Sequence, residues 1–187
     1  MRIIAGKFKG HQLVSFNANH IRPTTDRIKE SLFNIIQNEL TEQFIVVDLF
    51  CGTGSLGLEA LSRGVSYCTF VDSHPSSIRI LKRNLQKLKI APKQYTISQI
   101  DVLKWLKISN LDQIDLFLID PPFSQKLTDT VMQKLSQNPT LKANCLICIE
   151  SVFNEKIQSK YGTIKLIKQK IFKDKSLSIF QHLIDRA

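Results

Sequence analysis

Short apolar segments alternate with amphipathic helical segments along most of this chain, and this alternation restricts the fold more than any other feature. Each apolar segment has the length of a buried strand and is bounded by turn residues. Strands that alternate with helices favour right-handed crossovers and a parallel sheet covered on both faces. The predicted strands are 44–49, 67–71, 94–100, 114–119 and 144–150, and the predicted helices between them are 56–63, 78–88, 102–106 and 127–135.

The N-terminal segment has a different pattern. Residues 1–21 predict two short strands around the turn at Lys9-Gly10-His11, which form a small basic hairpin extension. A helix is predicted to begin near Asp26, because the apolar residues that follow it recur at helical spacing. These apolar residues are Ile28, Leu32, Ile35, Ile36 and Leu40.

The C-terminal segment reads as a terminal antiparallel hairpin. Residues 162–172 and 177–184 have strand-like composition and flank a polar turn. The chain has no internal repeat, low-complexity tract or long Gly/Ser linker. We therefore expect one domain over residues 1–187, in which 1–21 form the extension and 22–187 the core.

The charge balance suggests a polyanionic partner. Lysine and arginine number 26 against 16 acidic residues, for a net charge of +10. Such a surplus favours nucleic acid through the field of the whole molecule, although a lysine-rich solvated surface would give the same balance. Part of the surplus lies in residues 156–175, which have seven lysines and one aspartate. No apolar stretch approaches the length that spans a bilayer, so a cytoplasmic location without membrane association is expected.

The cysteine pattern does not predict a metal or redox centre. Cys145 and Cys148 have the spacing of a metal or redox pair but lie within an apolar run. A strand directs positions i and i+3 to opposite faces, and no second pair is present to complete a zinc site. We expect both cysteines to be small buried core residues and no metal to be bound.

A glycine-rich loop follows the first predicted strand. Asp48-Leu-Phe-Cys-Gly52-Thr-Gly54-Ser-Leu-Gly57 contains the G-x-G-x-x-G pattern of dinucleotide sites. Gly52 and Gly54 would let the backbone pass close beneath a ligand, and Gly57 would allow tight packing between helix and sheet. Asp72 ends the second strand and can accept both hydroxyls of a ribose. These residues alone fit a nicotinamide cofactor and S-adenosyl-L-methionine equally well.

Three features favour S-adenosyl-L-methionine. The carboxylate of Asp48 would repel a pyrophosphate but attract the amino group of a methionine moiety. Asp101 ends the third strand and offers an acceptor for the adenine amine. A dehydrogenase needs an acid, base or metal near its substrate, and no histidine stands at the end of a predicted strand. Each of these aspartates could instead cap a helix.

The tetrapeptide Asp120-Pro121-Pro122-Phe123 directly follows the fourth predicted strand. Open α/β sheets bind ligands at the carboxyl ends of their strands. The Asp120 side chain and the Pro121 carbonyl are two acceptors for the hydrogens of an exocyclic amine, and Phe123 offers a flat face for a base. This arrangement suits a planar nucleobase with an amino group, although Asp-Pro-Pro is also an ordinary turn.

At these residues the chain resembles the bacterial methyltransferases that modify a guanine N2 in small-subunit ribosomal RNA, the RsmD-like family. Cys51 and Thr53 stand where relatives often have Ala and Ser, and residues 99–102 are less typical of the family than the other matching segments. The matching segments are Met1-Arg-Ile-Ile-Ala-Gly-Lys7, Arg22-Pro-Thr-Thr-Asp-Arg27, Asp48-Leu-Phe-Cys-Gly-Thr-Gly54, Leu58-Glu-Ala-Leu-Ser-Arg-Gly64, Phe70-Val-Asp72 and Asp120-Pro-Pro-Phe123.

The resemblance implies a Rossmann-like class I methyltransferase with a seven-stranded, mostly parallel sheet, a C-terminal antiparallel hairpin and an N-terminal β-hairpin extension that touches RNA. Its substrate would be the exocyclic N2 of a guanine in 16S ribosomal RNA, within an assembling or assembled small subunit. The implied residues are Asp48, Phe50, Gly52, Gly54, Asp72 and Asp101 for S-adenosyl-L-methionine, Asp120, Pro121, Pro122 and Phe123 for the base and its reaction, and Arg2, Lys7, Arg22, Thr24 and Arg27 for RNA.

Three other functions remain open from the sequence. An adenine-N6 DNA methyltransferase could use the same tetrapeptide, but 187 residues leave little room for a separate target-recognition region. A basic RNA-binding module of this fold would lack catalysis, and the intact Asp120 and glycine loop argue against it. A dehydrogenase is the third alternative.

Overall fold

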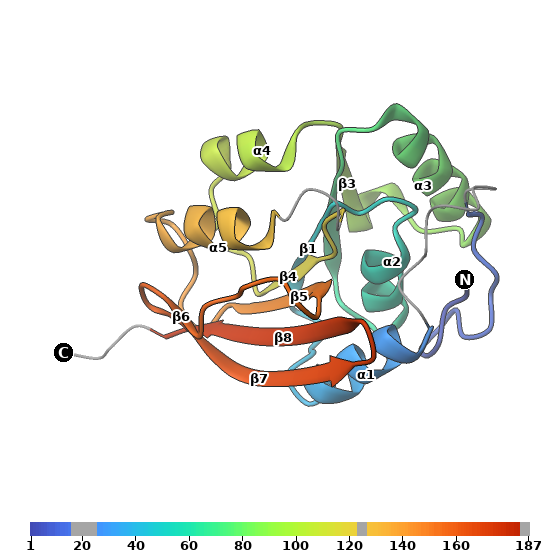
Figure 1. The fold of residues 1–187 in the computed structure, drawn as a ribbon. Helices are drawn as coiled ribbons and strands as arrows, with labels where there is room; N and C mark the ends of the chain where they lie inside the picture. The colour runs from blue at the N-terminus through green and yellow to red at the C-terminus, as the bar shows by residue number, and fades with distance from the viewer. Residues whose placement is uncertain (16–25, 123–126, 184–187) are drawn as a thin grey trace.

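The computed structural model describes residues 1–15, 26–122 and 127–183 and contains an eight-stranded sheet with helices on both faces (Figure 1). The strand order is β3-β2-β1-β4-β5-β8-β7-β6, and the first five strands in this order are parallel. This confirms the predicted mostly parallel α/β sheet. The parallel strands are β1 (Ile45–Leu49), β2 (Tyr67–Val71), β3 (Tyr95–Ser98), β4 (Leu116–Ile119) and β5 (Leu146–Val152).

The C-terminal strands form the antiparallel part of the sheet. β7 (Ile164–Phe172) and β8 (Lys175–His182) form the predicted hairpin, and β8 pairs with β5 in the antiparallel direction. The expectation of seven strands is wrong by one, because the two-residue β6 (Lys160–Tyr161) returns onto β7 around Gly162. Gly162 has a φ of 58°, which permits this tight return, and two residues are too few to produce a recognisable strand pattern.

The helices divide between the two faces of the sheet. One apolar cluster joins side chains of β1, β2, β4, β5 and β8 to helices α1 (Asp26–Ile36), α2 (Ser55–Ser62) and α3 (Pro75–Lys87). A second cluster joins the alternate strand residues to α4 (Val102–Ile108) and α5 (Thr128–Ser136). Val46 and Leu118 belong to the first cluster, whereas Val47 and Phe117 belong to the second, as the two-residue period of a strand requires. A short 3-10 helix, η1 (Pro92–Gln94), precedes β3.

The N-terminal residues 1–14, here called the N-terminal arm, fold back on themselves. The Ile3 amide donates to the His11 carbonyl (3.0 Å), and Arg2 and Gln12 form an antiparallel bridge. The predicted hairpin is therefore present within residues 1–15 as a single bridge and not as two full strands, and residues 16–21 of the predicted extension lie outside the described residues. The amides of Ile4 and Ala5 donate to a side chain of α2, so the pairing between the limbs does not continue through these residues.

Within the described ranges, no helix is both long and apolar enough to span a membrane. The same residues contain no group of three or more histidine, cysteine or acidic side chains arranged to hold a metal ion. The parallel strands β1 to β4 all end at one edge of the sheet, as Leu49 pairs with both Val71 and Ile119. This shared edge is where the predicted site residues meet.

Candidate active site

Three carboxylates converge at the carboxyl ends of the central strands. Asp48 lies near the end of β1, Asp72 directly follows β2, and Asp120 directly follows β4. Asp48 is close enough to the other two for both of their charges to raise its pKa. The side chains that the sequence assigned to cofactor and base are therefore neighbours in space.

The loop between β1 and α2 (residues 50–54, here called the glycine loop) adopts an unusual backbone. Phe50, Gly52 and Gly54 have φ values of 58°, 52° and 82°. The left-handed conformation costs a residue with a side chain about 1–2 kcal/mol, so Phe50 is held there by its surroundings. A Cβ on Gly54 would lie 2.4 Å from Leu81 of α3, so glycine is required for packing as well as for φ. The backbone thus passes where a side chain could not.

Asp48 lies beneath the glycine loop and is almost completely buried. Its side chain accepts a hydrogen bond from the Gly57 amide (2.8 Å) in the first turns of α2. Burial, together with the charges of Asp120 and Asp72, raises the pKa of Asp48 to about 8, against the opposing effect of the Gly57 amide. An arriving cation would favour the ionised form. The contact of Asp48 with a cofactor amino group stays a prediction.

Asp72 ties two loops together. One carboxylate oxygen accepts the Gly52 amide (2.9 Å) and the other accepts the His74 amide (2.7 Å). His74 in turn caps α3, since its ring nitrogen accepts from the Ser76 amide. Each oxygen of a carboxylate has a second lone pair, so both can still accept from a ribose. The structure therefore holds Asp72 in a fixed position beside the glycine loop.

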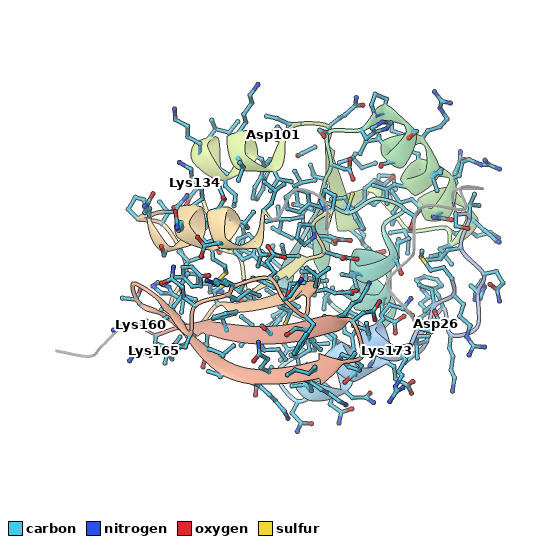
Figure 2. The ribbon with its side chains drawn as sticks, in the orientation of Figure 1. Asp26, Asp101, Lys134, Lys160, Lys165 and Lys173 are labelled. Atoms are coloured by element: carbon cyan, nitrogen blue, oxygen red, sulfur yellow. The ribbon has the colours of Figure 1, made fainter. Side chains whose placement is uncertain are left out.

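Asp101 is an exposed helix cap. Its Oδ1 accepts the Lys104 amide (3.0 Å) at the start of α4, and Figure 2 shows it near the end of that helix where the chain arrives from β3. Capping, the alternative use weighed for each aspartate, accounts for this residue in the structure. The cap occupies one oxygen, and the adenine contact of Asp101 stays a prediction.

The base-binding tetrapeptide is partly described. Asp120 is half-buried, Pro121 is buried and Pro122 is exposed at the end of β4. Phe123 lies outside the described residues, so its role as a stacking face stays a prediction. The described part lies at the carboxyl edge of the sheet, next to the end of β1.

Among the residues expected to contact RNA, three are described and all are exposed. Arg2 forms an ion pair with Asp26 (Nε to Oδ2, 3.2 Å), Lys7 lies over the Phe8 ring, and Arg27 is in the first turn of α1. Arg22 and Thr24 lie outside the described residues. Ion pairing with Asp26 partly compensates the charge of Arg2, so Lys7 and Arg27 are the stronger candidates for phosphate contacts.

The C-terminal lysines do not form one patch. Lys160 and Lys165 lie at the opposite end of β7 from Lys173 (Figure 2). Lys175 is buried and bonds to Glu150 on the neighbouring strand β5. The lysine-rich composition of residues 156–175 therefore overstates their ability to bind one polyanion.

A buried ion pair beside this site was missed from the sequence. Lys29 of α1 and Glu59 of α2 are both fully buried, with 3.7 Å between Nζ and Oε2, and Arg63 bonds to the same carboxylate (2.8 Å). Burial lowers the pKa of Lys29, and the charge of Glu59 opposes this effect. A signal was present, because Lys29 stands at helical spacing from the buried Phe33 and Ile36.

The cysteines are buried thiols, as expected. Cys148 belongs to one apolar cluster and Cys145 to the other, so they lie on opposite faces of the sheet. Burial raises the pKa of Cys148 to about 12 and that of Cys51, in the glycine loop, well above its ordinary value. None of the three has the accessible, acidic thiol of a nucleophile.

Comparison with known proteins assigns the chain to a family. A sequence model of the family described as Conserved hypothetical protein 95 matches residues 1–181. The chain belongs to the Conserved hypothetical protein 95 family. Its extent confirms the resemblance carried by the segments from Met1 to Phe123, and the fold and glycine loop described above belong to this family.

Proteins similar to this chain in sequence or structure are named as methyltransferases or methylases. The chain is 39% identical over 152 residues to ribosomal RNA small subunit methyltransferase D of Haemophilus influenzae, covering 81% of this chain and 78% of that protein. The solved structure of a putative methyltransferase from Escherichia coli superposes with a TM-score of 0.85 at 26% identity and 98% coverage of both chains. A putative methylase from Haemophilus influenzae gives a TM-score of 0.82 at 34% identity, again with 98% coverage of both.

Proposed function

We propose that this protein transfers a methyl group from S-adenosyl-L-methionine to the exocyclic N2 of a guanine in small-subunit ribosomal RNA. The observation that carries the proposal is the position of Asp120 directly after β4, which pairs with β1 up to the start of the glycine loop, and close enough to Asp48 for its charge to raise the pKa of that carboxyl. Family membership and the 39% sequence identity to ribosomal RNA small subunit methyltransferase D support three parts of this proposal: the enzyme class, the cofactor and ribosomal RNA as the substrate class.

The described residues fit this cofactor. The positive φ values of Gly52 and Gly54 open the backbone of the loop, and Asp72 is held beside it by two amides. Asp72 would accept the ribose hydroxyls, and Asp48 would attract the amino group of the methionine moiety. When bound, S-adenosyl-L-methionine supplies an electrophilic methyl group on a sulfonium sulfur.

The residues at the end of β4 would orient the acceptor. The guanine N2 is a poor nucleophile, because its lone pair is delocalised into the ring. Asp120 would accept one N–H of this amine and the Pro121 carbonyl the other, which turns the lone pair toward the methyl donor. Alignment of this kind contributes several kcal/mol to catalysis. Asp120 would also stabilise the positive charge that develops on the nitrogen and accept or relay its proton.

The target nucleotide must be accessible to these groups. A base stacked in a helix cannot reach the Asp120 carboxylate, so we expect a loop nucleotide or a flipped base. Exposed Lys7 and Arg27 would bind phosphates, and RNA affinity should then fall steeply with added salt. An assembling or assembled small subunit as the physical substrate, and a cytoplasmic location, belong to this proposal.

The test is methyl transfer from labelled S-adenosyl-L-methionine to small subunits and ribosomal RNA from a strain that lacks the protein. Nucleoside digestion should yield labelled N2-methylguanosine. Asp120→Ala should lower turnover by roughly 10²- to 10⁴-fold, because it removes an acceptor and a charge at the reacting nitrogen, and cofactor affinity should be unchanged.

Asp120→Asn is the matched control, because it keeps an acceptor of the same size and removes only the charge. Activity that survives in Asp120→Asn but not in Asp120→Ala would assign Asp120 an orienting role without proton transfer. Full activity in Asp120→Ala would refute its assignment, and label in adenine of DNA would replace the proposed substrate.

A further inference from the structure

The N-terminal arm is joined to the cofactor site by a buried lysine. Lys29 Nζ, in α1, donates to the Arg2 carbonyl of the arm (2.6 Å) and to the Ser55 hydroxyl (3.1 Å). Ser55 is the first residue of α2 and directly follows the glycine loop. Lys29 is fully buried, so water cannot replace these contacts without a structural change. The ammonium group of Lys29 therefore bonds both to the arm and to the residue that directly follows the glycine loop.

A second buried side chain makes a closer connection. Asn84 of α3 is fully buried, and its Oδ1 accepts the Val14 amide of the arm (2.7 Å). Its Nδ2 donates both to the Val14 carbonyl (3.0 Å) and to the Thr53 carbonyl of the glycine loop (2.9 Å). The Thr53 hydroxyl also lies 3.4 Å from the sulfur of Met1, at the start of the arm. One limb of the arm thus contacts the loop that is proposed to hold the cofactor at Thr53, and the other limb is linked to the same residue through Asn84.

The opposite side of the arm is fastened to α2. The two oxygens of Glu59 accept the Ile4 and Ala5 amides at 2.8 and 3.0 Å. At the last residue of α2, the Ser62 hydroxyl accepts the Phe8 amide (2.9 Å) and donates to the Ala5 carbonyl (2.6 Å). These buried contacts give the arm one defined position, which we call seated.

The glycine loop depends on such surroundings. Phe50 and two glycines of the loop have left-handed backbone conformations, and these persist only where neighbouring groups determine them. Asn84 restrains the loop at Thr53, between Gly52 and Gly54, and its two bonds to Val14 orient the amide group that makes this contact. Loss of the seated arm would release this restraint.

We infer that Asn84 and Lys29 are positioning residues that make cofactor affinity depend on the seating of the N-terminal arm. The arm carries the candidate RNA contacts Arg2 and Lys7, so RNA that binds the seated arm would tighten cofactor binding. By linkage, the cofactor would tighten RNA binding by the same factor. This second part rests on the proposed function, whereas the first part concerns the cofactor site alone.

Two glycines of the arm provide a matched test. Gly6 and Gly10 have φ values of 78° and 84°, so alanine is similarly strained at either position. A Cβ on Gly6 would lie 1.8 Å from the Ser62 carbonyl oxygen, whereas a Cβ on Gly10 would meet nothing within 4 Å. Only Gly6→Ala therefore unseats the arm. It acts at the far end of α2, about 11 Å from the glycine loop for a helix of this length.

The first measurement is the affinity of each variant for S-adenosylhomocysteine by calorimetry, with thermal unfolding recorded alongside. Gly6→Ala should bind on the order of tenfold more weakly than the wild type, and Gly10→Ala should bind as the wild type does. Equal affinities in all three would overturn the inference. If Gly6→Ala does not fold, Ser62→Ala removes two contacts of the arm at milder cost, and it should weaken binding in the same direction.

The second measurement repeats the titration with small-subunit ribosomal RNA present. RNA should tighten cofactor binding in the wild type and do so by a smaller factor in Gly6→Ala. An RNA effect that is absent, or equal in the two proteins, would overturn the coupling. Methyl transfer by the wild type without coupling would refute only this inference, whereas binding of S-adenosylhomocysteine without any transfer to RNA would refute the proposed function.

Discussion

Cofactor binding should release a proton from Asp48. The pKa of this carboxyl is about 8 in the structure, so at pH 6.5 it is almost completely protonated. An adjacent ammonium group lowers a carboxyl pKa by about one to three pH units. A fall of about two units on binding corresponds to roughly 0.7 proton released at pH 6.5, and to about hundredfold tighter binding above pH 8 than below pH 6.

Calorimetry of S-adenosylhomocysteine at pH 6.5, in buffers with different ionisation enthalpies, measures this proton directly. The cofactor amino group remains charged at this pH, so it contributes little to the count. Asp48→Asn is the control, because an amide can still accept the Gly57 amide but cannot ionise. It should release no proton, and its affinity should be lower than that of the wild type and no longer increase between pH 6 and 7. Equal proton release by the two proteins would refute the role of Asp48.

Asp48 should also make the free energy of unfolding depend on pH, and in the opposite direction to its effect on cofactor affinity. The pKa of Asp48 is raised in the folded state, above its ordinary value of 3.8, so the folded state retains a proton that the unfolded chain loses. The free energy of unfolding should therefore fall between about pH 4 and pH 8, by up to about 1.4 kcal/mol per pH unit from this group. Asp48→Asn should remove that slope in urea unfolding. An unchanged slope would show that the carboxyl is not buried as described.

Two further predictions concern stability. Lys175→Met should destabilise the protein by about 3–5 kcal/mol in urea unfolding, because it removes a buried cation that bonds to the buried Glu150, and adding Glu150→Gln should recover part of the loss; a change within the range of a surface pair, under about 1 kcal/mol, would contradict this. Gly57→Ala should cost about 1–3 kcal/mol in the same assay, because the new Cβ would lie 2.4 Å from the Phe70 ring and 2.6 Å from the Cys68 sulfur; unaltered stability would show that these side chains can move aside.

The strands and helices of the core were predictable because their residues repeat at the period of the element. β2 has the predicted bounds, and β1, β4 and α2 begin or end within two residues of them. The N-terminal segment was predicted as two short strands around the turn at Lys9-Gly10-His11. The amides of Ile4 and Ala5 bond to Glu59, and the sequence pattern of the arm contains no information about a side chain more than 50 residues away.

The candidate site was predictable to the same extent. Asp48, Asp72 and Asp120 could be placed together, because each lies at or directly after the end of a strand of one parallel sheet and such ends share an edge. The raised pKa of Asp48 could not be predicted, since it depends on how closely the glycine loop and α2 cover that carboxyl. Capping by Asp101 was one of two uses that the sequence left open, and the structure decided between them. The connections of Asn84 depend on three segments that meet only in the folded chain.

Local order along the sequence therefore determined which residues form each strand and helix, the glycine loop, and the set of carboxylates at one edge of the sheet. These properties follow from periodicity and chain direction, which act between near neighbours. Only the tertiary structure decided that Glu59 and Asn84 are buried, that Lys29 pairs with Glu59, and that the N-terminal arm is linked to the cofactor loop. Burial and hydrogen bonding between distant segments depend on the packing of the whole chain, and no local pattern encodes that packing.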